Sequence, residues 1–305
     1  MRIHFTIVLL CIIILSSCSK SWYVFTSFRE PANEGLRLLY SKDARHWNRL
    51  DSIFLVPGVG KQKVMRDPSV VKGPDDSFHM VWTSSWQGDK GFGYASSKDL
   101  IHWTPQQFIP VMQHEPTTFN VWAPELYYDQ DSSRYIIVWA SCIPGRFEKG
   151  IEADSNNHRL YYTTTKDFNQ FTPTKLFLDP GFSVIDAVIV RRAKNDFVLV
   201  LKDNTRPERN LKIAFGSSAI GPWSAASAKF SDKFTEGPSV VKDGEDWLIY
   251  FDAYQDKSYQ AVSTKDFKSF TVPDPAISIP EGHKHGTIFQ TNKKTIRRLL
   301  KYTSQ

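Results

Sequence analysis

The sequence predicts an all-β fold, a single five-bladed β-propeller, from three observations. First, one short pattern recurs five times along the chain. Second, the runs between the copies are rich in Val, Ile, Tyr, Trp and Phe, as β-strands are, and no long helical stretch interrupts them. Third, the two ends of the chain carry complementary halves of one repeat. Together these features describe a ring of similar blades.

The recurring pattern is a short strand, a turn with Ser or Thr and usually Lys-Asp, and then an aromatic residue. The closing aromatic residues lie 47 to 68 residues apart, which suits four-stranded blades and argues against a β-sandwich of similar strand number. The five copies are YSKDARHW (40–47), YASSKDLIHW (94–103), YYTTTKDFNQF (161–171), AFGSSAIGPW (214–223) and AVSTKDFKSF (261–270).

The two ends of the chain predict how the ring closes. The first repeat has WYVFTSF (22–28) and LRLLYS (36–41) but no inner strand before them. The C-terminal run KHGTIF (284–289) looks like an inner strand, and no outer strands follow it. We expect this last strand to complete the N-terminal blade, because closure removes exposed sheet edges.

The charge of the chain gives no sign of a nucleic-acid partner. The formal net charge is +6, but the basic residues are spread out and no nucleic-acid-binding motif is visible. The densest basic run, NKKTIRRLLK (292–301), predicts a terminal helix with a solvated basic face. Its apolar residues Ile296, Leu299 and Leu300 are expected to pack inward.

The N-terminus reads as a targeting segment. Arg2 precedes an apolar run of 11 residues (5–15), which is too short to span a bilayer comfortably. The run ends in Leu-Ser-Ser-Cys18, which resembles the lipobox of bacterial lipoproteins, in which the cysteine is lipidated and becomes the first residue. We expect residues 1–17 to be a signal peptide and 18–305 one propeller domain, held at the bacterial cell envelope by its lipid alone. An ordinary secretory signal is the alternative.

The cysteine content excludes a disulfide framework and a cysteine-based zinc site. Only three cysteines occur, and two of them, Cys11 and Cys18, lie in or at the end of the targeting segment. Cys142 stands in an apolar run and is expected to be a buried, unreactive thiol.

Ionisable residues stand at the starts of the five predicted inner strands. They are Asp67, Glu125, Asp186, Glu236 and His285, and their places in the repeats look equivalent. In a propeller these starts converge on one mouth of the central axis. A charged group is costly to bury without partners or a function. We therefore expect a functional site there, rather than five unrelated strand caps or ion pairs.

Clustered carboxylates suit the cleavage of a glycosidic bond. One carboxylic acid protonates the leaving oxygen, a second carboxylate activates water, and a third raises the pKa of the acid by repulsion. Metal-assisted hydrolysis would need more His or a denser Asp cluster. No nucleophile elbow, Walker loop or dinucleotide fingerprint is visible.

At these residues the sequence resembles glycoside hydrolase family 43, over essentially all of the chain after the signal peptide. The resemblance implies a five-bladed propeller with inverting arabinofuranosidase or xylosidase activity and no required cofactor. It implies that Asp67 is the general base, that Asp186 tunes the acid and orients the sugar, and that Glu236 is the general acid. The motifs that carry it are MRDPSVV, VWAPELYYD, GFSVIDAVIV, FTEGPSVV and HKHGTIF.

Two features depart from this pattern. The chain begins with outer strands rather than with the base-bearing inner strand, so the ring closes differently from that of many members. The Arg-Asp-Pro motif at 66–68 is also similar to that of the related retaining fructosidases, but their Trp-x-Asn-Asp-Pro-Asn-Gly and Glu-Cys motifs are absent.

For His285 and Glu125 the sequence leaves two roles open. The resemblance implies that His285 lies on the axis near a metal ion such as calcium, or near a water cluster, and next to substrate; a satisfied core histidine is the alternative. Glu125 either contacts substrate hydroxyls or pairs with an Arg or Lys.

Further substrate contacts are expected from aromatic and loop residues. Trp86, Trp122 and Trp139 are candidates for sugar stacking, with blade packing as the alternative. The polar segment 201–210 is expected to border the pocket through Lys202, Asp203 and Arg206, or else to be a solvated loop.

The predicted function is that of an inverting, exo-acting glycoside hydrolase on plant-type or related oligo- and polysaccharides, most plausibly an α-L-arabinofuranosidase. Long inserts at 104–121 and 142–160 are expected to close its pocket. The alternatives are a β-xylosidase, galactofuranosidase or galactosidase of the same family, and a glycan-binding surface lipoprotein without activity. A phosphorylase or lyase is a further alternative, but a phosphorylase would need several Arg and His at the mouth, where we find one His.

Overall fold

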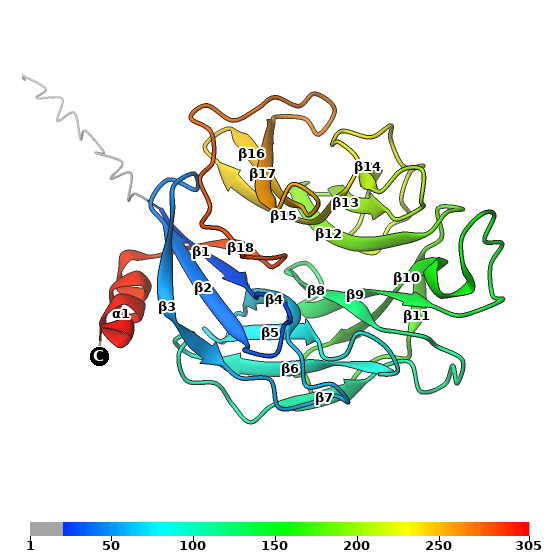
Figure 1. Cartoon of the computed structure of the whole chain (residues 1–305), viewed down its shortest axis with the longest axis horizontal. Coiled ribbons are helices and arrows are strands. Elements are labelled where there is room, and N and C mark those ends of the chain that lie inside the picture. Colours follow the sequence, from blue (N-terminus) through cyan, green and yellow to red (C-terminus); the bar gives the residue numbers. More distant parts are fainter. Residues whose placement is uncertain (1–20, 305) are drawn as a thin grey trace, which may run out of the picture.

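Five antiparallel sheets of three or four strands stand around a common axis in the computed structural model of the chain (Figure 1). The structure describes residues 21–304, and the predicted signal peptide (1–17) and Cys18 lie outside that range. The predicted all-β, five-bladed propeller is confirmed. The helices within residues 21–304 include none that is both long and apolar enough to cross a membrane.

The first blade joins the two ends of the described chain. Its strand order is β18-β1-β2-β3, and β18 pairs antiparallel with β1, with Phe25 opposite Ile288 and Trp22 opposite Thr291. The predicted closure of the ring by the C-terminal inner strand is therefore confirmed. The strands are β1 (Trp22–Ser27), β2 (Leu36–Ser41), β3 (Trp47–Leu55) and β18 (Ile288–Thr291).

The other four blades follow in chain order from the axis outward. Blade 2 contains β4 (Arg66–Lys72), β5 (Phe78–Thr83), β6 (Gly91–Ser97) and β7 (Gln107–Pro110). Blade 3 contains β8 (Trp122–Asp129), β9 (Arg134–Cys142), β10 (His158–Thr165) and β11 (Lys175–Leu178). Blade 4 contains β12 (Val184–Ala193), β13 (Asp196–Asp203) and β14 (Asn210–Gly216). Blade 5 contains β15 (Thr235–Asp243), β16 (Asp246–Ala253) and β17 (Ser258–Thr264).

The recurring Ser-Lys-Asp turn is held by side chains that accept hydrogen bonds from backbone amides. In blade 2, Ser97 Oγ accepts from the amides of Asp99 and Leu100, and Asp99 Oδ1 accepts from the amides two and three residues further on. This turn brings Trp103 back to bridge Ser97, which explains the aromatic residue at the end of the pattern. The same carboxylate contacts recur at Asp43, Asp167 and Asp266.

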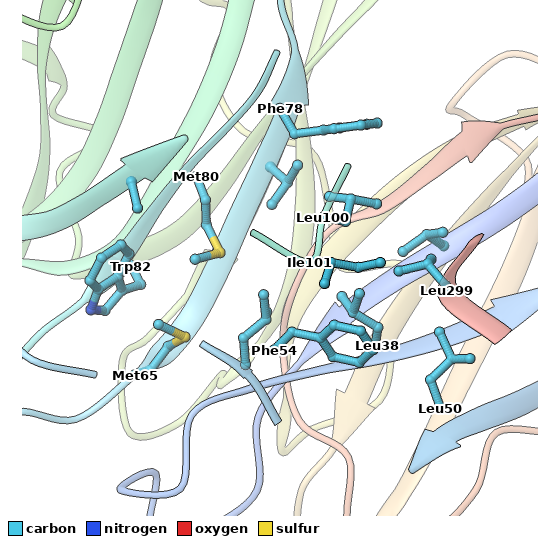
Figure 2. Packing of buried hydrophobic residues seen from close by; sticks show 14 of the residues in the cluster. Leu38, Leu50, Phe54, Met65, Phe78, Met80, Trp82, Leu100, Ile101 and Leu299 are labelled. Atoms are coloured by element: carbon cyan, nitrogen blue, oxygen red, sulfur yellow. The ribbon is translucent and has the colours of Figure 1, made fainter. Parts of the chain in front are cut away.

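The predicted terminal helix is confirmed as α1 (Lys293–Thr303). It follows β18 and packs outside blade 1 (Figure 1). Ile296 and Leu299 are buried in the apolar cluster between blades 1 and 2, where Figure 2 shows Leu299 beside Leu38 and Ile101. The expectation that Leu300 packs inward is wrong, because its side chain is 37% exposed. The helix rests on β3 along a narrow stripe, and Leu300 lies about 100° around the helix from Leu299.

Cys142, at the end of β9, is a free and buried thiol, as predicted. Its Sγ donates a hydrogen bond to the carbonyl of Asp154, and burial raises the pKa of the thiol. This environment is the opposite of the electropositive, exposed one that activates a cysteine.

We expect the substitution Leu299→Ala to lower the free energy of unfolding by about 3 kcal/mol, since it removes a fully buried side chain and leaves a cavity. Leu300→Ala, one residue away, is the matched control and should cost less than about 1 kcal/mol. Urea denaturation followed by tryptophan fluorescence measures both. Equal losses for the two variants would contradict the packing described for α1.

Candidate active site

Four of the inner strands begin with a β-bulge that turns one residue toward the axis. The bulges lie between Arg66 and Ser69 and at the matching places in β8, β12 and β15. In each of these four blades, the residue directly after the last regular pair before the bulge has a positive φ. This conformation is uncommon for residues other than glycine. These residues are Asp67 (φ 53°), Ala123 (φ 46°), Asp186 (φ 51°) and Gly237 (φ 60°).

His285 takes the corresponding place in blade 1. Ser69 Oγ accepts from the backbone amide of the next inner strand, and Thr287 Oγ1 accepts from the amide of Val70 in the same way. His285 stands two residues before Thr287, as Asp67 stands two residues before Ser69. Asp67, Asp186 and His285 therefore share one position of the repeat.

The expectation of five equivalent positions is wrong for the two glutamates. Glu236 lies one residue before the bulge position that Gly237 occupies, and Glu125 lies two residues after the position of Ala123. A β-bulge adds a residue, so distance from the apolar run does not fix the place of a side chain. Gly237 has its own reason to be there, because a Cβ at this position would lie 2.4 Å from Cγ of His285.

A pocket of about 340 Å³ opens at the mouth of the axis. The structure brings together there the three proposed catalytic carboxyl groups, two of the predicted tryptophans and His285. The lining residues include Asp67, Asp186, Glu236, Trp86, Trp122, Lys202, Tyr254 and His285.

Asp67 is held as a carboxylate. Thr83 Oγ1 donates to its Oδ2 over 2.7 Å, and His285 Nδ1 lies 3.2 Å from its Oδ1. Burial alone would raise the pKa of Asp67, but the hydrogen bond and charge of His285, with help from Arg66 and Thr83, hold that pKa below its usual value. Asp67 is therefore ionised at neutral pH.

His285 is the positive centre of the site. Burial lowers its pKa, but the hydrogen bond to Asp67 and the charges of Asp186, Asp67 and Glu236 raise the pKa to about 9. The ring is then an imidazolium at neutral pH, with no lone pair to offer a metal ion. Residues 21–304 contain no group of three or more His, Cys, Asp or Glu side chains arranged to hold a metal. In this metal-free state His285 is not a metal ligand, and we derive no step through a metal; the metal ion or water cluster expected near it stays a prediction.

Asp186 and Glu236 lie side by side with opposite tendencies to ionise. Asp186 Oδ2 accepts from the amide of Gly237 over 3.0 Å, and burial raises the pKa of Asp186 despite the charges of His285 and Lys202. Glu236 Oε2 lies 2.7 Å from Nζ of Lys202. Burial would raise the pKa of Glu236 as well, but the charge and hydrogen bond of Lys202 lower it. In the substrate-free site a shared proton therefore favours Asp186.

Glu125 lies below the pocket, in a narrow axial cavity that it shares with Asp67, Ser69 and Asp186. Burial raises its pKa to about 7, although the nearby Ser69 hydroxyl and the charge of His285 oppose this. Neither predicted role fits its position. It does not line the sugar-sized pocket, and no Arg or Lys of the described chain lies within ion-pair distance.

Trp86 and Trp122 form an aromatic wall of the pocket. Their ring centroids lie 4.9 Å apart, and Trp122 Nε1 donates to the carbonyl of Trp86. The Arg66 guanidinium lies 4.5 Å from the centroid of Trp86, and Trp86 is 49% exposed. Trp139, by contrast, is fully buried and belongs to the core between blades.

The polar segment 201–210 divides between the pocket and the surface. Lys202 lines the pocket, whereas Asp203 is buried against Lys212 at 2.7 Å. Arg206 does not reach the pocket. Its side chain is 56% exposed, with Nε 3.8 Å from Glu152. Arg209, from the same segment, lines the pocket instead, because the turn after β13 points Arg206 outward.

Of the two long inserts, only 142–160 reaches the pocket, through Asn156 in the short 3₁₀ helix Asp154–Asn156. The insert 104–121 supplies no lining residue, because its residues 107–110 form β7 at the outer edge of blade 2. Sequence reasoning also missed Tyr254 and Arg66 in the lining. Arg66 directly precedes Asp67 in the Arg-Asp-Pro motif, and that position could have indicated that it lines the pocket. Nothing in the sequence around Tyr254 indicates that it does.

Comparison with known proteins agrees with this geometry. Residues 20–296 match the family described as "Probable glycosyl hydrolase domain", whose label relates it to glycoside hydrolase family 43. An α-L-arabinofuranosidase of Bifidobacterium longum is 25% identical over 122 residues, which cover 36% of this chain and 11% of that enzyme.

Two solved structures share the fold. An endo-arabinase from Bacteroides thetaiotaomicron superposes with a TM-score of 0.60 at 14% identity, over 86% of this chain and 91% of that chain. An α-L-arabinofuranosidase from Lactobacillus brevis gives a TM-score of 0.51 at 17% identity, over 68% and 71% of the two chains.

Replacing His285 by glutamine tests the charge pair with Asp67. The folded-state pKa of His285, about 9, lies above that of an unfolded histidine, about 6.5, so its stabilising effect is complete below about pH 6.5 and is lost as the pH rises through about 9. We expect the stability advantage of the wild type over H285Q to shrink by about 3 kcal/mol between pH 6 and pH 10.

Urea titrations at several pH values measure this difference. The variant H114Q is the matched control, since the imidazole of His114 is exposed and forms no ion pair among the described residues, and its stability should track that of the wild type throughout. A difference between wild type and H285Q that does not change with pH would refute the ionised pair.

Proposed function

Because the chain belongs to the family of probable glycosyl hydrolase domains related to glycoside hydrolase family 43, we propose that it is an inverting, exo-acting glycoside hydrolase. The observation that carries the proposal is that Asp67, Asp186 and Glu236 line one pocket while their environments favour different protonation states. Pairs of carboxyl groups whose pKa values are driven apart are the mark of acid–base chemistry. Its substrates are oligo- or polysaccharides.

Asp67 is the general base of the proposed reaction. Its carboxylate is ionised and held by Thr83 and His285, so it can take a proton from a water molecule. That water attacks the anomeric carbon from the face opposite the leaving group, which inverts the configuration.

Glu236 is the proposed general acid, and Asp186 is the proposed source of its proton. Glu236 is ionised against Lys202, while burial favours the proton on Asp186. A sugar in the pocket excludes water, which raises the pKa of Glu236, and its hydroxyl groups donate to Asp186, which favours the Asp186 carboxylate. The proton then passes from Asp186 to Glu236 and on to the leaving oxygen, while Lys202 balances the charge left behind.

The proposed sugar is a terminal furanose or pentose, with α-L-arabinofuranose first. The support is that the B. longum relative and the L. brevis structure are α-L-arabinofuranosidases by name, and that the B. thetaiotaomicron structure is an arabinase. Trp86 and Trp122 line the pocket, and Trp86 is 49% exposed, so its indole is a candidate for stacking on a sugar ring. Xylose, galactofuranose and galactose are the alternatives. Glycan binding without catalysis has less support, because all three carboxyl groups are present.

We also propose that the protein is a lipoprotein of the bacterial cell envelope, with residues 1–17 removed and Cys18 lipidated. The support is the sequence before residue 21, where a short apolar run ends in Leu-Ser-Ser-Cys.

Substitution of Glu236 by Gln should lower kcat by about a thousandfold, since the amide cannot donate the proton to the leaving oxygen. Arabinofuranosyl oligosaccharides, whose sugar leaving group needs the proton, measure this loss. A panel of p-nitrophenyl glycosides identifies the sugar, with α-L-arabinofuranoside expected to react best. Glu245→Gln, at a side chain that is 91% exposed, is the matched control and should keep full activity. Wild-type turnover by E236Q, or NMR detection of a product with retained configuration, would refute the proposed mechanism.

Substitution of Lys202 by Met should move the alkaline limb of the pH profile of kcat/KM upward by about one unit or more. The reason is the sign of the interaction: Lys202 lowers the pKa of Glu236, so its removal raises that pKa and keeps the acid protonated to higher pH. Lys212→Met, which breaks a similar 2.7 Å ion pair outside the pocket, is the control. An unchanged limb in K202M would show that Glu236 is not the titrating acid.

Replacing Cys18 by Ser should move the protein from the membrane fraction to the soluble fraction of the cells. Mass spectrometry of the purified wild type should find a lipid on a chain that begins at Cys18. An unlipidated wild type would leave an ordinary secretory signal as the explanation.

A further inference from the structure

A second cavity, of about 750 Å³, lies on the same mouth of the propeller, between blades 5 and 1. Tyr254 lines both this cavity and the catalytic pocket. Beside Tyr254, Lys284 and Asp252 line the second cavity as an ion pair. Asp252 stands directly opposite Glu236 in the β15–β16 pairing. A saccharide that extends from the catalytic pocket past Tyr254 would therefore enter this second cavity.

The positive charge of this cavity is incompletely neutralised. Arg29 and Arg49 line it, and neither lies within ion-pair distance of a carboxylate in the part of the chain that the structure describes; the neighbouring Arg37 is paired with Glu34. Nε of Arg29 is buried and lacks a hydrogen-bond partner among the described residues. A buried donor without a partner is costly unless a ligand satisfies it.

Carboxylates also face the cavity, and two of the four are already used. Glu30 is paired with Arg66, and Asp252 with Lys284. Three basic side chains without an ion pair remain in the lining, Arg29, Arg49 and Lys257. The carboxylates without an ion pair are Asp256 and Glu281, so the net charge of these unpaired groups is positive.

A histidine holds Arg29 in place without neutralising it. His283 is buried, its Nδ1 lies 3.2 Å from Ser27 Oγ, and its Nε2 lies 3.5 Å from Nη2 of Arg29. Burial and the charges of the nearby arginines lower the pKa of His283 to about 3, so the ring is neutral and its Nε2 can accept from the guanidinium. The other guanidinium donors of Arg29 remain free, in the planar arrangement that matches a carboxylate.

We propose that this cavity binds a uronic acid residue through its carboxylate, next to the sugar in the catalytic pocket. The natural substrate would then be an acidic oligosaccharide or polysaccharide. The inference rests on the proposed function only in that the catalytic pocket is taken to bind and cleave a sugar. Binding of the acidic residue in the second cavity can be measured without hydrolysis.

The test compares two acidic probes with their own neutral forms. The probes are xylotriose carrying one glucuronic acid, and trigalacturonate; the neutral forms are the same saccharides with each carboxylate reduced to an alcohol. Isothermal titration calorimetry measures binding to the E236Q variant, so that no probe is hydrolysed. We expect at least one acidic probe to bind about tenfold or more tightly than its neutral form, the scale of a charge-assisted hydrogen bond.

In the same background, Arg29→Gln and, separately, Arg49→Gln should reduce this preference by about tenfold. Arg49 is exposed, so its variant tests the site even if R29Q folds poorly. Arg298→Gln is the matched control, because Arg298 lines a separate basic groove with Lys72 and Lys98 and should leave the preference unchanged.

Three results would overturn the inference: no preference for either acidic probe, a preference that survives both arginine substitutions, or displacement of the acidic saccharide by an equal concentration of inorganic sulfate. Hydrolysis of neutral p-nitrophenyl glycosides by the wild type is measured separately. Binding of an acidic probe without any hydrolysis would refute the proposed function and leave this inference standing. Hydrolysis without any preference for the acidic probes would refute this inference and leave the proposed function standing.

Discussion

The pairing of β18 with β1 is the interaction on which the rest of the molecule depends. It joins two strands from opposite ends of the chain and completes the first blade, whose strand order is β18-β1-β2-β3. It also brings His285 to within 3.2 Å of Asp67 in the neighbouring blade. The same pairing thus closes the fold and supplies the positive charge that lets three carboxyl groups be buried around one small pocket.

The fold could be predicted because its signals are local and repeated. Each Ser-Lys-Asp turn satisfies its own amides, as Ser97 and Asp99 do, so the turn is visible in the sequence wherever it occurs. The incomplete repeat at each end then left one economical way to close the ring. The residues that the resemblance marked, Asp67, Asp186 and Glu236, meet in one pocket for the same reason: each lies among the first three residues of an inner strand.

The errors came from features that the sequence does not encode locally. The bulge in β8 places Ala123 at the position that Asp67 takes in β4, so Glu125, two residues further on, lies in the axial cavity. The path of a loop decides that Arg209 reaches the pocket and Arg206 does not. The partner of a buried group is likewise set by a neighbouring blade, as for Lys202 and Glu236, and no spacing within one repeat reveals that contact.

The antiparallel register of the first blade also fixes which way the molecule faces. Trp22 pairs with Thr291 at the far end of β18, whereas His285 stands before the near end of that strand, at the mouth. The described chain therefore starts on the side of the propeller away from the pocket. If the proposed lipid anchor holds the protein at that side, the mouth of the pocket faces away from the membrane, and the ends of a bulky polymer can reach it.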